Sequence, residues 1–174
     1  MEPFAVEKKD LEAYTLLGYR VRDFIHLTLL WQRVQEGLDL LEGVPNLGPD
    51  HLADTLRTAS LGWLASLVDP HKSAVNAFRV WPKIFPHRKT EIENAERLLA
   101  PHMKTLQAFR DTVAFHSNKS IKEYQKARAG IKNPDFIKAT EGFLDFAEQM
   151  LNEEERVLGL SKARASMEGK AALS

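Results

Sequence analysis

The sequence predicts an all-α protein, an up-and-down bundle of four to five helices with short accessory helices. Three observations predict this fold class. Apolar residues recur at steps of three and four along most of the chain, and no window alternates β-branched and polar residues between turn signals. Glycine and proline clusters divide these periodic segments into antiparallel helices with short connections. With 174 residues, 44% of them hydrophobic, we expect one domain over residues 1–160 and a flexible tail over 161–174.

The first two helices are separated by a cluster of helix breakers. We expect the first helix over about residues 6–42, on an apolar stripe made by Leu11, Tyr14, Leu17, Val21, Phe24, Ile25, Leu29 and Val34. Residues 43–50 contain two glycines and two prolines, which end it. The second helix runs from about Asp50 to Val68, because Asp69 precedes Pro70 and the residue before a proline leaves helical space.

The middle of the chain predicts a short helix and then a longer one. The short helix carries Val75, Phe78, Val80 and Trp81, and Pro82 and Pro86 bracket a turn after it. The longer helix covers about residues 90–116, with Thr90 and Glu93 at capping-box spacing. Pro101 inside it should kink or split it. We expect the aromatic residues of this region to pack in the core, namely Trp63, Phe78, Trp81 and Phe85.

Two helices are predicted to complete the chain. A helix over about residues 120–130 ends near Gly130, after the polar run at 116–120. The last helix starts at Asn133 and Pro134, with asparagine as the cap and proline in the first helical position.

Composition excludes several classes of protein. The 24 basic and 24 acidic side chains cancel, so the chain is not a general polyanion binder and any nucleic-acid contact needs a local patch. Cysteine is absent, which removes disulfides and thiolate chemistry and fits a cytoplasmic location. No apolar stretch approaches the roughly 18 residues of a membrane span, so we expect no membrane partner.

The strongest chemical feature is the segment from Arg110 to His116. Arginine offers a planar fork that suits phosphate, and histidine exchanges protons near neutral pH, so the pair has the parts of a small phosphodiester site. Six helical steps turn by about 600° and leave the two side chains about 120° apart. They converge only if the helix ends or bends before His116, and Asp111 could then orient either group. The alternative is an exposed arginine and a histidine that caps the helix C-terminus.

The stretch Leu106-Gln-Ala-Phe-Arg110-Asp111-Thr-Val-Ala-Phe-His116-Ser-Asn-Lys119 resembles the signature of the HEPN superfamily. That signature is an arginine, often followed by a polar residue, and then a histidine after four to six intervening residues, near the end of a helix. The preceding helix over residues 60–69 resembles the abortive-infection members of the superfamily. The resemblance covers roughly residues 50–125.

This resemblance implies a metal-independent endoribonuclease that needs no cofactor. In that scheme His116 is the general base or acid at a ribose 2′-hydroxyl, Arg110 binds the scissile phosphate, and Asp111 is the polar residue after the arginine. It also implies a homodimer whose two motifs share a cleft, and a toxin of a defence or toxin–antitoxin system with an antitoxin as protein partner. Phe115 and Asn118 depart from the small residue and the acid often found at these positions. A non-catalytic HEPN-like binding module is therefore the alternative.

The residues after the motif predict an RNA contact. Only Glu123 is acidic between residues 119 and 132, against five basic residues, which gives a local charge of 5 − 1 = +4; the five are Lys119, Lys122, Lys126, Arg128 and Lys132. A basic flank beside a phosphate site suits RNA docking, and we expect the first four to bind it. The alternative is a solvated helix face.

The histidines raise a third hypothesis, a metal-binding helical bundle. Six are present, at positions 26, 51, 71, 87, 102 and 116. Bundle metal sites use Glu-x-x-His, which does not occur, and the nearest match is the single stretch from Asp23 to His26. The sequence therefore predicts no metal site and no cofactor.

Overall fold

The computed structural model describes the main chain of residues 8–36, 49–114 and 121–171, and side chains within 9–36, 51–112 and 122–153. Within these residues every regular element is a helix and none is a strand, which confirms the predicted all-α bundle. The longer helices are α1 (Lys8–Gln35), α2 (Pro49–Leu67), α3 (Ala77–Ile84), α4 (Lys89–Leu99), α5 (Met103–Phe109), α6 (Ile121–Gly130) and α7 (Pro134–Ala171). Short helical turns lie at η1 (Pro86–Arg88), η2 (Ala100–His102) and η3 (Arg110–Ala114).

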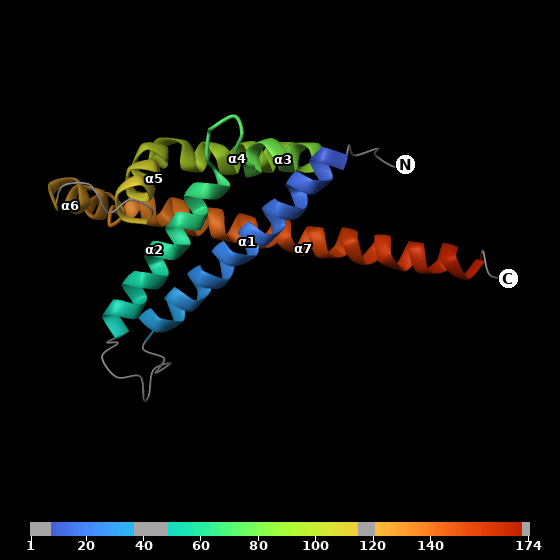
Figure 1. Ribbon diagram of the computed structural model, residues 1–174, viewed down its shortest axis with the longest axis horizontal. Helices are drawn as coiled ribbons and strands as arrows, with labels where there is room; N and C mark the ends of the chain where they lie inside the picture. The colour runs from blue at the N-terminus through green and yellow to red at the C-terminus, as the bar shows by residue number, and fades with distance from the viewer. Residues whose placement is uncertain (1–7, 37–48, 115–120, 172–174) are drawn as a thin grey trace.

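The helices form two groups that cross each other (Figure 1). Helices α1 and α2 make an antiparallel hairpin, which is joined by a buried hydrogen bond between Thr28 and Ser60. The hairpin crosses the long helix α7, and α3 and α4 follow one another along α7. Helices α5 and α6 pack together at the far end of the molecule from the N-terminus of α1.

An aromatic cluster on α7 joins the two groups. Phe143 is fully buried, and its ring lies 5.8–6.3 Å from four other rings, those of Phe24, Phe78, Trp81 and Phe146. The predicted core role of the aromatic residues is confirmed: Trp81 and Phe85 are buried, and Trp63 and Phe78 pack against the same core. Such aromatic contacts stabilise a core beyond the area that they bury.

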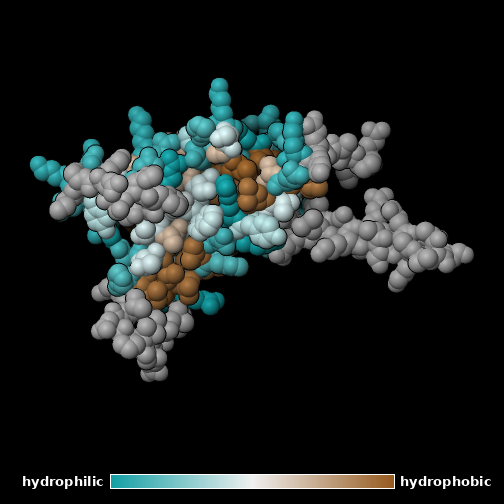
Figure 2. Space-filling model, viewed as in Figure 1, coloured by the Kyte–Doolittle hydropathy of each residue, from teal (hydrophilic) through white to brown (hydrophobic). Residues whose placement is uncertain are grey.

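The surface is mostly hydrophilic, with hydrophobic areas on the α1 side. Figure 2 shows one such area near each end of the α1–α2 hairpin. Four leucines of α1 are exposed at their side chains, namely Leu11, Leu16, Leu29 and Leu30. No helix in the described part of the chain is both long enough and apolar enough to cross a membrane.

Several helix boundaries agree with the predictions from local sequence. Helix α2 ends at Leu67, and η2 separates α4 from α5 at Pro101, so the proline splits the predicted 90–116 helix. Asn133 caps α7, because its Oδ1 accepts the backbone N–H of Asp135 at 2.8 Å. The C-terminal end predicted for the first helix lies outside the described residues. Helix α7 continues to Ala171, so residues 161–171 are helical where the sequence predicts a flexible tail, and the flexibility of this tail stays a prediction.

Two predictions between residues 82 and 93 are wrong. Pro82 does not begin a turn, because it lies inside α3, which ends two residues later. Thr90 is not an N-cap, because η1 runs directly into α4 and places Thr90 within the first turn of that helix. The capping box with Glu93 therefore does not form, and Arg88 instead pairs with the Glu91 carboxylate.

Candidate functional site

Arg110 lies where α5 changes from an α-helical to a π-helical turn. Its Nη1 donates to Oδ2 of Asp69 at 2.7 Å, and its Nε donates to Oδ1 of Asp111 at 2.8 Å. The side chain is only 25% exposed. A π-helical turn inside a helix often marks a functional site. Arg110 is thus a paired, partly buried side chain, which does not match the alternative of an exposed arginine.

The electrostatics of this cluster keep the guanidinium charged. The hydrogen bond to Asp111 contributes most to raising the pKa of Arg110 above its ordinary value; partial burial opposes this, and Asp69 adds to it. The two bonds use two of the five N–H donors of a guanidinium. One guanidinium and two carboxylates carry a net charge of 1 − 2 = −1. The carboxylates therefore orient Arg110, and anion binding there requires more positive charge nearby.

Asp69 is the site residue that the sequence analysis missed. Its carboxylate joins two segments, since Oδ2 accepts from Arg110 while Oδ1 accepts the backbone N–H of His71 at 2.9 Å. An aspartate before Pro70 at the end of a helix is typical of a turn that bonds its own backbone. That local signal could have identified the turn. It could not have identified Arg110 as the second partner, because the two residues are 41 positions apart.

The backbone of the loop over residues 69–76 is held by two side chains, those of Asn76 and of Arg79 on α3. Arg79 donates to the carbonyl oxygens of Asp69, His71 and Ala74 at 3.2, 2.7 and 3.0 Å, and to that of Lys72 at 3.4 Å. Asn76 donates to the Asp69 carbonyl at 2.9 Å and also caps α3 through Phe78. The exposed polar side chains of the loop, those of His71, Lys72 and Ser73, are therefore carried on a fixed backbone next to Arg110.

The other predicted site residues fall into three groups. His116 and Lys119 lie outside the described residues. Lys122 and Lys126 are exposed on α6. The guanidinium of Arg128 is bonded to the Asp54 carboxylate, with Nη1 to Oδ2 at 2.7 Å, and to the hydroxyl of Tyr124 at 2.9 Å. Arg128 thus ties α6 to α2, and its role in RNA binding stays a prediction that this pairing disfavours.

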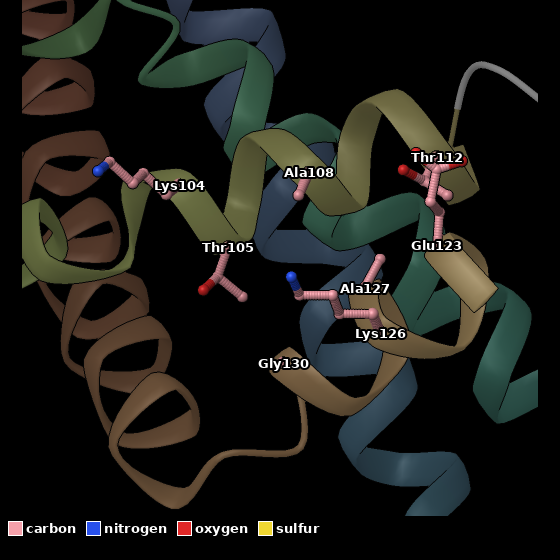
Figure 3. A pocket seen from close by; sticks show the side chains of 8 residues that line it. All are labelled: Lys104, Thr105, Ala108, Thr112, Glu123, Lys126, Ala127 and Gly130. Carbon is pink, nitrogen blue, oxygen red and sulfur yellow. The ribbon is translucent and has the colours of Figure 1, made fainter. Parts of the chain in front are cut away.

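A cleft of about 540 Å³ separates α5 and η3 from α6 (Figure 3). Thr112 and Glu123 lie at one end of it, and Thr105 faces Gly130 at the other. A Cβ atom on Gly130 would lie 2.9 Å from Cγ2 of Thr105, so a glycine permits the close approach of the two helices there. The cleft is also lined by Lys104, Ala108, Lys126 and Ala127. It begins in the same π-helical turn as Arg110, and Lys126 brings a positive charge to it.

No group of three or more His, Asp or Glu side chains that could hold a metal ion occurs in the described part of the chain. Comparisons with protein-family models, with curated proteins and with solved structures find no match for this chain. The resemblance to the HEPN superfamily therefore rests on the residues of the motif alone.

Proposed function

We propose that the chain is a HEPN-like, metal-independent endoribonuclease in which Arg110 holds the scissile phosphate and His116 exchanges a proton with the ribose 2′-hydroxyl. The observation that carries this proposal is the fixing of Arg110 by Asp69 and Asp111 at a π-helical turn. A guanidinium held in one orientation stabilises the charge that develops on a phosphate without reorganising during the reaction. In this scheme Asp111 would orient Arg110 through the hydrogen bond that it accepts from Nε.

The charges around the cluster also support an anionic substrate. Arg79 bonds the Asp69 carbonyl and Lys72 lies on the same loop, so two further positive side chains accompany Arg110 in this region. Lys122 and Lys126 extend positive charge along α6, and Lys126 lines the cleft. Contacts of this kind with successive phosphates supply most of the affinity of proteins for nucleic acid. RNA is therefore the proposed substrate.

The resemblance extends the proposal to biology and assembly. A homodimer would bring two Arg110–His116 motifs to one cleft, and an antitoxin would be the protein partner of such a toxin in the cytoplasm. The second candidate is a HEPN-like module that binds RNA without cutting it. The observation that favours it is the double pairing of Arg110, because both carboxylates compete with a phosphate for the guanidinium.

Cleavage of a defined RNA in excess chelator tests the first proposal. We expect the wild-type protein to cleave and both Arg110→Ala and His116→Ala to lose cleavage by about 10²-fold or more. Matched controls are Arg33→Ala and His51→Ala, which remove an exposed arginine and an exposed histidine far along the α1–α2 hairpin. Retained cleavage in both site variants would exclude the enzyme. Binding without cleavage by the wild type, unchanged in His116→Ala, would establish the binding module.

A further inference from the structure

We propose that His71 is a second proton-transfer residue of the Arg110 site and delivers a proton to the 5′-oxygen that leaves when RNA is cut. This inference rests on the proposed ribonuclease function and adds a catalytic group to it. The signature segment supplies one histidine, His116. Cleavage by an internal 2′-hydroxyl needs one group to remove a proton and another to supply one in the same step.

One carboxylate places His71 beside the arginine. The two oxygens of Asp69 accept separately from Nη1 of Arg110 at 2.7 Å and from the backbone N–H of His71 at 2.9 Å. A phosphate bound by this guanidinium therefore lies next to the loop that carries the histidine. Of the histidines with described side chains, His71 is the one that shares a hydrogen-bond partner with Arg110.

The loop is built to hold its exposed side chains in place. Arg79 and Asn76 bond its carbonyl oxygens, so the backbone of His71 is fixed by contacts that do not involve its own ring. The ring is exposed, and its Nδ1 lies 2.8 Å from Oγ of Ser73. Because Nδ1 is engaged with Ser73, exchange of a proton with a substrate falls to Nε2. Such second contacts of an imidazole decide which of its nitrogens acts.

The proposed step balances in protons and electron pairs. The ribose 2′-hydroxyl loses its proton to His116, and its oxygen forms a bond to phosphorus. The bond from phosphorus to the 5′-oxygen breaks, and that oxygen takes the proton from Nε2 of His71. The products are a 2′,3′-cyclic phosphate and a 5′-hydroxyl, and no water, metal or oxidant takes part.

The experiment compares two substrates that differ in their leaving group. In a dinucleotide the leaving group is the 5′-oxygen of the second nucleoside, an alkoxide that needs a proton. In uridine 3′-(4-nitrophenyl phosphate) the leaving group is 4-nitrophenolate, which does not need one. We expect His71→Ala to cut the rate on the dinucleotide by about 10²- to 10⁴-fold and to leave the aryl ester within about tenfold of wild type. His116→Ala should lower both rates, because it removes the base. His71→Gln is a second variant with a side chain that can still bond Ser73, and the urea midpoint of each variant should match that of wild type.

Each outcome decides a different claim. Equal loss on both substrates, or no loss on the dinucleotide while the wild type cleaves it, overturns the role of His71 and leaves the ribonuclease standing. Absence of cleavage by the wild type on both substrates overturns the proposed function together with this inference. Partial restoration of the dinucleotide rate in His71→Ala by added imidazole would support the assignment directly.

Discussion

Replacing Asp69 by asparagine removes the charge that holds Arg110 with almost no change in shape. The amide keeps an oxygen that can accept the His71 N–H, but its NH₂ group then faces the Arg110 donor. A hydrogen bond between charged groups contributes roughly 1.5 to 3 kcal/mol. The two side chains are 24% and 25% exposed, so water screens the pair only in part. We expect Asp69→Asn to lower the free energy of unfolding by about 2 kcal/mol.

A double-mutant cycle isolates this bond. Wild type, Asp69→Asn, Arg110→Met and the double variant are unfolded in urea and followed by the fluorescence of the chain's three tryptophans. The matched control is Asp111→Asn, which removes the other carboxylate from the same guanidinium. Asp111 contributes more to the pKa of Arg110, but it is 40% exposed and lies beside Arg110 in the unfolded chain as well. We therefore expect a coupling of about 1.5 kcal/mol or more for Asp69 and of about 0.2 to 1 kcal/mol for Asp111.

The coupling should not depend on pH near neutrality. The pKa of Arg110 is raised, so its stabilising contribution is fully present below the ordinary arginine pKa and is lost only above the raised value, in strong alkali. The cycle should give the same coupling at pH 6 and pH 8. A coupling below about 1 kcal/mol for Asp69, within the range of exposed ion pairs, would refute the claim that it fixes Arg110. A larger coupling for Asp111 would assign that role to the neighbouring residue.

Three further predictions test the core, the helix contacts and the basic face. Phe143→Ala should lower the free energy of unfolding by about 3 to 5 kcal/mol in urea titrations, and a loss below about 1 kcal/mol would contradict its central place in the aromatic cluster. Gly142→Ala should raise the melting temperature, because helix propensity improves by up to about 1 kcal/mol and the Cβ meets only the flexible end of a leucine. Gly130→Ala should not raise it, since its Cβ meets a short threonine, and equal gains would show that the cleft helices do not constrain each other. Lys126→Ala should reduce the salt dependence of RNA binding by about one unit of slope. Arg128→Ala should instead lower the urea midpoint through loss of its pairing with α2, and the reverse pattern would mean that this arginine faces RNA.

Local chemistry explains which boundaries were predictable. The cap at Asn133 and the break at Pro101 depend on the residue itself and on neighbours within one turn, so the sequence pattern is enough to find them. Thr90 failed as a cap because the η1 turn leads directly into α4 at Lys89, so Thr90 is already a helical residue. Pro82 failed as a breaker because a single lost N–H near a helix end is tolerated where the helix is packed on the core.

The all-α class and the main helices follow from the sequence alone, because helical periodicity is visible in short segments, and the Arg110–His116 spacing makes Arg110 a candidate site residue. The partners of the predicted side chains do not follow from it. Asp69 and Arg110 are 41 residues apart in the sequence, and Asp54 and Arg128 are 74 apart. These contacts therefore form only when the α1–α2 hairpin and the loop after it pack against α5 and α6. Tertiary packing thus decided that Arg110 is held between two carboxylates beside the His71 loop, and that Arg128 ties two helices together. Long-range contacts depend on how helices cross, which no local pattern encodes.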